Sequence, residues 1–136
     1  MRNNRSMPRA SVIPVLAYPD VAEAVAWLRR AFGFRERLRI GGHRAQLVYG
    51  NGALVIVEGS VSPGEGVGLM IRVEDADHHC AVAVAAGARV VAPPTSFPYG
   101  ERQYSVEDFA GRQWTFSQSI ADVDPADWGG ELRSSD

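Results

Sequence analysis

The chain has few side chains that combine in the way a catalytic centre requires. His78 and His79 are adjacent in an expected helix, so their side chains would point about 100° apart and could not easily chelate one ion. His43 follows a Gly-Gly pair in an expected hairpin, which places it at the surface or at a pocket rim. Glu58 and Glu107 suit metal binding or acid–base work, but neither has a histidine partner nearby in the sequence. Metal and acid–base chemistry are therefore the two possibilities to test against the fold.

Cysteine chemistry is limited by number. Cys80 is the only cysteine, so neither an intrachain disulfide nor a cysteine-built zinc site can form within one chain. It lies in the apolar run CAVAVAA, where burial disfavours the reactive thiolate. We expect a buried structural thiol.

Composition points to one globular domain. The chain has 136 residues, 46% of them hydrophobic, and a net charge of −2, which offers no general attraction to nucleic acid or to an anionic membrane. No apolar stretch approaches the roughly 18 residues of a membrane span, and MRNNRSMPRA lacks the apolar segment of a secretory signal. We therefore expect a cytoplasmic protein that binds neither nucleic acid nor membrane, with residues 1–10 as a disordered tail.

Two halves of the chain resemble one another. VIPVLAYPDVAEAVAWL from Val12 aligns with VGLMIRVEDADHHCAVA from Val67 at an offset of 55 residues, which places Asp20 on Asp75. Each segment is a run of strand type that ends in an acid able to cap a helix. The apolar spacing predicts a first helix over about 21–32, ended by Gly33, and a second from about residue 76, ended by Gly87.

The similarity continues after the helices at an offset of 59. The turn YGNG at 49–52 lies on DFAG at 108–111, and the strand ALVIVEG that follows lies on RQWTFSQ. Each half is thus a βαβββ unit, over 11–60 and 67–120, followed by a tail over 121–136 with a short helical turn at Asp124-Pro125. The predicted fold class is α+β, with two βαβββ units about a pseudo-twofold axis and curved sheets around a cleft.

One segment carries a family resemblance. PYGERQYSVEDFAGRQWTF, from Pro98, resembles the Tyr-Gly-Glu-Arg … Asp-Pro-x-Gly-x-x-Trp segment of small bacterial members of the vicinal oxygen chelate superfamily, which includes glyoxalases, dioxygenases and bleomycin resistance proteins. Phe109-Ala110 departs from that pattern in the turn. The resemblance covers residues 11–118, and it implies a cleft that binds a small molecule and, in most members, a homodimer.

The same resemblance implies four metal-ligand positions. Members that use a metal carry one ligand near the start of each unit's first strand and another in each unit's last strand. These positions correspond here to Ile13, Gly68, Ile56 and Thr115, none of which is a good ligand for a divalent ion. We therefore expect no metal and no cofactor.

Strand alternation then predicts what lines the cleft. Residues i and i+2 share a face of a strand, so positions in phase with the family's ligand positions should face the cavity. The predicted ligand-binding residues are Ile13, Val15, Gln46, Leu54, Ile56, Met70, Arg72, Gln103, Gln113 and Thr115.

Several nearby roles stay open from sequence. Arg72 could bind an anion, reach the rim or pair with Glu107, and Tyr99 and Arg102 could line the cleft mouth or serve only their own loop. Trp114 is expected in the core, Trp27 at the surface or an interface, and Trp128 as an anchor for the C-terminal turn.

Three functions remain possible at this stage. The first is a metal-free binding protein, similar to bleomycin resistance proteins, that sequesters a drug or metabolite. The second is a divergent glyoxalase- or dioxygenase-like lyase or isomerase, with a rearranged metal site or with proton transfer by Glu107 and Tyr104. The third is a module whose cleft is vestigial. A homodimer is expected in each case, and the units could pair within one chain or be exchanged between chains.

Overall fold

The computed structural model describes residues 4–61 and 68–132. Its first strand, β1 (Val15–Tyr18), leads into helix α1 (Val21–Phe32). Asp20 caps this helix, because its side chain accepts a hydrogen bond from the backbone N–H of Glu23. Gly33 ends the helix in the left-handed region at φ 84°, where a side chain would be strained. The helix therefore begins and ends where the sequence predicts.

The first unit, which we call the N-module, continues as an antiparallel sheet. Its strands β2 (Arg35–Ile40), β3 (Arg44–Tyr49) and β4 (Gly52–Glu58) follow one another, and β1 pairs in parallel with β4. The strand order is β1-β4-β3-β2. A bulge between Glu36 and Leu38 interrupts the edge strand β2.

The second unit, the C-module, repeats this plan with the order β5-β8-β7-β6. Its elements are β5 (Leu69–Arg72), α2 (Ala76–Ala85), β6 (Arg89–Phe97), β7 (Glu101–Glu107) and β8 (Gln113–Ser119). A 3-10 turn, η1 (Pro125–Trp128), follows the sheet. Residues 62–67, which include most of the link predicted at 60–66, lie outside the described residues. The α+β class and the paired βαβββ units are confirmed.

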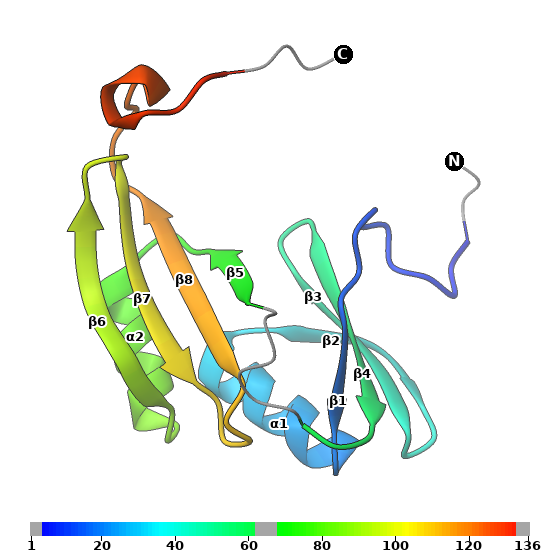
Figure 1. Ribbon diagram of the computed structural model, residues 1–136. Coiled ribbons are helices and arrows are strands. Elements are labelled where there is room, and N and C mark those ends of the chain that lie inside the picture. Colours follow the sequence, from blue (N-terminus) through cyan, green and yellow to red (C-terminus); the bar gives the residue numbers. More distant parts are fainter. Residues whose placement is uncertain (1–3, 62–67, 133–136) are drawn as a thin grey trace.

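Each helix covers one face of its own sheet, and the two modules meet through their helical sides (Figure 1). The core lies between these layers. Phe32, at the end of α1, packs against Trp114 and Phe116 of β8, with ring centroids 5.1 and 4.9 Å apart. Trp114 is fully buried, as the sequence predicts. Trp27 is also buried, and its indole N–H donates to the carbonyl of Ala86 across the module boundary at 2.9 Å.

A buried carboxylate also joins the modules. Asp108 follows β7 and is only 5% exposed; its carboxylate accepts hydrogen bonds from the Tyr18 hydroxyl at 2.7 Å and from the Trp114 indole N–H at 3.0 Å. It also accepts from the backbone N–H groups of Ala110 and Arg112. The Arg112 guanidinium lies over the Tyr18 ring and donates to the carbonyl of Ala17. The expected turn at 108–111 is thus also a polar link between the modules.

Back-to-back packing leaves the other side of each sheet uncovered by either helix. Within the described residues, the two sheets share no strand pairing, and the outer edges of β1 and β5 pair with no other strand. Nor does any helix in this part of the chain have the length and apolarity needed to cross a bilayer.

Candidate ligand-binding faces

The sheet face turned away from the helix, here called the open face, is the surface that the sequence analysis expects to bind a ligand. Strand register identifies its residues, because side chains of paired residues lie on the same side. Val15 pairs with Val55, and Val55 pairs with Gln46, so these three share the open face of the N-module. Met70 pairs with Thr115, and Thr115 with Ser105, on the open face of the C-module.

Leu54 and Ile56 lie elsewhere than predicted. Ile56 pairs with Leu16 and Ala45, and together with Leu54 it belongs to the buried core beneath the helix. The two halves superpose at an offset of 60 in their last strands, since Val55 and Thr115 pair with equivalent residues of β1 and β5. The turn before β8 is longer than the turn before β4, so the offset between the last strands is 60 residues and not the predicted 59. Because neighbouring residues of a strand face opposite sides, this difference of one residue moves the predicted β4 side chains to the opposite face.

The remaining predicted residues are distributed over two separate surfaces. Val15 and Gln46 belong to the N-module open face, and Ile13 lies half-buried just before β1. The C-module open face holds Met70, Arg72, Gln103, Gln113 and Thr115. Because the modules pack back to back, one chain does not bring these two surfaces together around a single cleft.

The N-module open face is mainly apolar. Val15 is 57% exposed, and Val55, behind it on β4, is buried. The amide of Gln46 is the buried polar group of this face: its Oε1 accepts from Arg37 Nη1 at 2.6 Å, and its Nε2 donates to the carbonyl of Ser6 at 2.8 Å. The expected N-terminal tail is thus hydrogen-bonded to β3 at Ser6.

The C-module open face is polar and its side chains are hydrogen-bonded in series. Tyr99 donates through its hydroxyl to Gln103 Oε1, and Gln103 Nε2 donates to Ser117 Oγ at 3.0 Å. Ser117 in turn donates to Glu101 Oε1 at 2.6 Å. This hydrogen bond, with smaller contributions from Ser119 and the nearby Arg72 charge, lowers the pKa of Glu101. The face therefore presents a carboxylate that stays ionised beside amide and hydroxyl groups.

Glu107 and Tyr104 do not form the acid–base pair considered from sequence. They lie three residues apart on β7, so their side chains point to opposite faces. Glu107 pairs with Arg89, at 2.6 Å from Nη2, whereas Tyr104 is buried in the core. Arg72 therefore does not pair with Glu107, which was one of the roles considered for it from sequence. Its side chain is exposed on the open face.

His79 is more important than the sequence indicates. Its ring is not solvated on the helix surface but half-buried between the modules, and it packs at a tilt against Phe116, with ring centroids 4.2 Å apart. Nε2 lies 3.0 Å from the carbonyl of Phe32 and must therefore carry the proton, which leaves Nδ1 to accept from the Tyr104 hydroxyl at 2.5 Å. Desolvation lowers the pKa of His79. Its spacing from Phe32 gives no sequence signal, since the contact is between modules.

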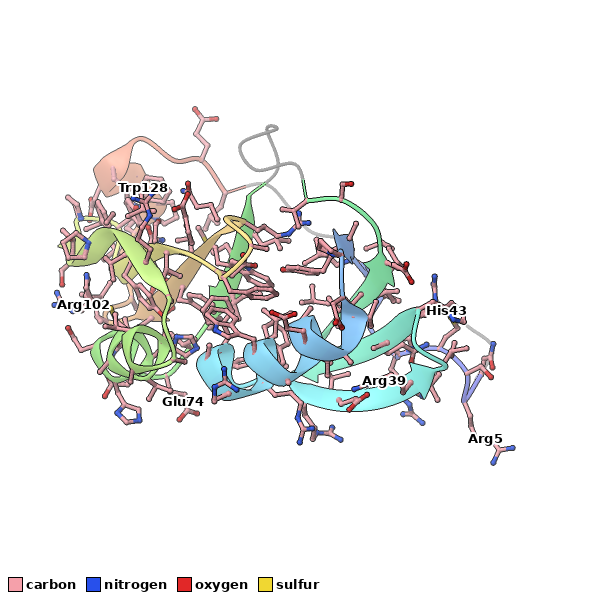
Figure 2. The ribbon with its side chains drawn as sticks, turned by 90° about the horizontal axis from the view of Figure 1, so that it is seen from below. Arg5, Arg39, His43, Glu74, Arg102 and Trp128 are labelled. Carbon is pink, nitrogen blue, oxygen red and sulfur yellow. The ribbon has the colours of Figure 1, made fainter. Side chains whose placement is uncertain are left out.

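The other singled-out side chains lie at the periphery. Arg102 forms a two-pronged ion pair with Asp77 of α2 and donates to Ser96, so it braces the helical side rather than a cleft mouth. Trp128 packs on Tyr99 with centroids 5.2 Å apart and anchors the C-terminal turn. His43 is exposed at the β2–β3 turn, and Figure 2 shows it at the end of the N-module that points away from the C-module.

A groove of about 1160 Å³ runs along the free edge of β5, between the modules. It is lined by β5 and the residues just after it, by the end of α1 around Phe34 and by the turn at Tyr49–Gly52. Leu54, Met70 and Arg72 are the predicted site residues that reach it. The sequence gives no sign of this groove, because no local pattern shows how two helical layers are spaced.

The donor set does not fit a metal ion. The open-face positions of the first and last strands are Val15, Val55, Met70 and Thr115, which supply three hydrocarbon or thioether side chains and one hydroxyl. Among residues 4–61 and 68–132, no group of three or more His, Cys, Asp or Glu side chains is placed to hold an ion. In the observed register of β4 the position equivalent to Thr115 is Val55 rather than Ile56. Together with Ile13 and Gly68, the family's metal positions therefore carry no adequate ligands.

Comparison with known proteins identifies a protein family that matches most of the chain. The sequence model described as "Glyoxalase/Bleomycin resistance protein/Dioxygenase superfamily" matches residues 12–116. Comparison with curated proteins gives no significant match.

Solved structures share the fold. TioX from Micromonospora sp. ML1 is 37% identical, with a TM-score of 0.69 over 80% of this chain and 98% of TioX. A family enzyme from Burkholderia phytofirmans PsJN is 19% identical, with a TM-score of 0.70 over 79% of this chain and 97% of its own. The fosfomycin resistance protein FosX from Listeria monocytogenes is 16% identical, with a TM-score of 0.68 over 82% of this chain and 94% of its own. The last two comparisons show the fold alone.

Proposed function

Because the chain belongs to the glyoxalase/bleomycin resistance protein/dioxygenase superfamily, we propose that it is a metal-free protein that sequesters a small molecule, a drug or a metabolite, on its open faces. The observation that carries this proposal is the hydrogen-bonded series Tyr99–Gln103–Ser117–Glu101 on an otherwise uncovered sheet face. Such convergent polar groups are what orients a bound small molecule.

The donor set supports binding over metal-assisted catalysis. A hydrolytic or isomerising centre of the family's metal type needs several N/O ligands around one point, and these positions carry Val, Met and Thr. The ionised Glu101 and the exposed Arg72 can orient a polar ligand by charge. The hydroxyls of Ser105 and Thr115, 2.9 Å apart, offer further hydrogen bonds.

The proposed binding unit is a homodimer in which modules are exchanged. The N-module of one chain would face the C-module of the other, so that an apolar wall and a polar wall enclose the ligand. Two features support this arrangement: the edges of β1 and β5 carry exposed Val15 and Met70, and the helical sides within one chain are already buried against each other.

A paired thermal-shift experiment tests the proposal. Wild-type protein purified without a His-tag is first titrated with Mn²⁺, Zn²⁺, Ni²⁺ and Fe²⁺, and no saturable rise in Tm is expected, because no ligand set is present. It is then screened against aromatic natural products at a fixed concentration. A compound that raises Tm should lose its effect in Gln103→Ala and keep it in Ser96→Ala, a matched polar-to-alanine change at a β6 position that pairs with Arg102 and so faces the helical side.

Two results would contradict the proposal. A large, stoichiometric stabilisation by one metal ion would restore the enzymatic interpretation. Stabilising compounds that bind equally well to wild-type protein and to Gln103→Ala, Arg72→Ala and Val15→Lys would place the binding site away from both open faces.

A further inference from the structure

The N-terminal segment occupies a built polar site on the N-module open face. Arg37 Nη2 donates to the carbonyl of Arg5 at 2.8 Å, and Gln46 Nε2 donates to the carbonyl of Ser6 at 2.8 Å. Arg37 and Gln46 are themselves joined by a 2.6 Å hydrogen bond. Two neighbouring side-chain donors thus hold two consecutive peptide carbonyls.

The segment is shaped to present these carbonyls together. Asn4 forms a turn: its side-chain oxygen accepts from the N–H of Ser6 at 3.0 Å, and its carbonyl accepts from the N–H of Met7 at 3.2 Å. Pro8, two residues after Ser6, is buried. In Figure 2 the side chain of Arg5 extends away from the domain, so that residue is bound through its main chain. We call residues 4–8 the strap.

The strap lies over both donors, of which Gln46 is buried and Arg37 is half-buried. Gln46 is 3% exposed, although it lies on a face that no helix covers. Its cross-strand neighbours on this face are apolar, with Leu38 on β2, Val55 on β4 and Val15 beyond on β1, whereas Arg44 is the charged residue on the same side of β3. If the strap moved away, an amide N–H and a guanidinium N–H would point from an apolar floor toward solvent. That combination is suited to an extended molecule with carbonyl acceptors.

We propose that Arg37 and Gln46 form a subsite for two adjacent carbonyl acceptors, as in a peptide-like backbone, and that the strap is its intramolecular competitor. The inference rests on the proposed function, since the ligand that displaces the strap is the one bound on the open faces. It adds a ligand class and a means of control. A ligand without paired acceptors leaves the strap in place and has access only to the rest of the face.

Strap docking can be measured on the full chain without any ligand. Trypsin cleaves after Arg5 and Arg9, and mass spectrometry follows loss of the N-terminus. In the variant Asn4→Ala/Pro8→Ser, which changes the strap but leaves Arg37 and Gln46 intact, we expect cleavage at least tenfold faster than in wild type. Gln46→Leu and Arg37→Met should each accelerate cleavage too. Equal trypsin cleavage rates in all four proteins would show that the strap is not docked on Arg37 and Gln46.

Occupancy by an outside molecule is tested with a defined probe, a fluorescein-labelled peptide of sequence NRSMPR, corresponding to residues 4–9. A tethered strap acts at millimolar effective concentration, so the peptide should bind the Asn4→Ala/Pro8→Ser variant at least tenfold more tightly than wild type, by fluorescence anisotropy. Adding Gln46→Leu to that variant should return the peptide affinity to the wild-type value.

If the strap is released in the double variant yet the peptide gains no affinity, the carbonyl subsite is wrong. Circular dichroism of each variant shows whether it is folded, and Arg37→Met in the released background provides a second test should Gln46→Leu fail to fold. None of these results depends on the natural-product screen, so the subsite and the proposed function can fail separately.

Discussion

Asp108 shows how one side chain can join two modules. Its two oxygens accept four hydrogen bonds, from two backbone N–H groups of its own turn and from the side chains of Tyr18 and Trp114. Burial, followed by the neighbouring Asp108 charge, raises the pKa of Tyr18, so its hydroxyl remains a donor at every pH of interest. Asp108 belongs to the family motif, but the sequence shows it only as the first residue of a turn and gives no sign that it joins the two modules.

Replacement of Asp108 by Ala should lower the free energy of unfolding by about 3 kcal/mol, because buried donors on Tyr18 and Trp114 would lose their acceptor. Tyr18→Phe removes only one of these hydrogen bonds and should cost about 1 kcal/mol. Urea denaturation of both variants measures the difference. A cost for Asp108→Ala no larger than that for Tyr18→Phe would contradict a joining role.

His79 gives the fold a dependence on pH. Its pKa is lowered by burial in the folded state, so the unfolded chain binds a proton more readily. Stability should be greatest above about pH 6.5, the ordinary histidine pKa, and should decline as the pH falls from there toward the folded-state pKa. Urea midpoints between pH 5 and 8 measure this slope.

The matched variants are His79→Gln and His78→Gln. Glutamine can donate to the Phe32 carbonyl and accept from Tyr104 without titrating, so His79→Gln should flatten the profile between pH 5 and 6.5. His78 is exposed on the same turn of α2, and its replacement should leave the slope unchanged. The reverse pattern would show that His79 is not the titrating group.

At the scale of elements, hairpin turns decide which faces are presented. The turn between β6 and β7 is closed by Gly100, at φ 84°, whose carbonyl accepts from the N–H groups of Ile120 and Ala121 and so ties the end of β8 to this turn. A Cβ at Gly100 would lie 2.5 Å from the carbonyl oxygen of Ala121. This glycine is required both by its backbone angle and by close approach.

Gly100→Ala should therefore destabilise the protein by roughly 2–3 kcal/mol, from left-handed strain and the steric clash together. Gly87→Ala is the control: it has a similar positive φ of 97° but nothing within 4 Å of the added Cβ, so it should cost about 1 kcal/mol. Thermal or urea unfolding distinguishes the two. Equal losses of stability in the two variants would mean that the segment around Ala121 moves away from Gly100 and relieves the clash.

At the scale of the whole molecule, charge is divided between the modules. Residues 1–59 contain nine arginines and four carboxylates, whereas residues 60–136 contain five arginines and twelve carboxylates. The net charge of −2 thus conceals a basic N-module and an acidic C-module. In an exchanged dimer, opposite charges would face each other, whereas pairing of like modules would oppose charges of the same sign.

Met70→Glu tests this assembly. Met70 is 63% exposed at the free edge of β5, and a charge there should shift a dimer toward monomer by at least tenfold in the dissociation constant, without loss of Tm extrapolated to low concentration. Sedimentation equilibrium provides the measurement. Val84→Glu, on the outer side of α2, should leave the dimer intact. A monomeric wild type, or equal effects of both changes, would rule out pairing through β5.

The sequence by itself determined the elements and their repeat, because capping acids, terminal glycines and alternating strands are local signals. Asp20, Gly33 and the turn at 49–52 all have the roles predicted for them. The tertiary structure alone decided the face of β4, the burial of His79 and the strap on Gln46. A strand's side chains reverse with a one-residue change in turn length, and contacts between residues far apart in the chain depend on how whole layers pack. Both properties lie beyond any local pattern.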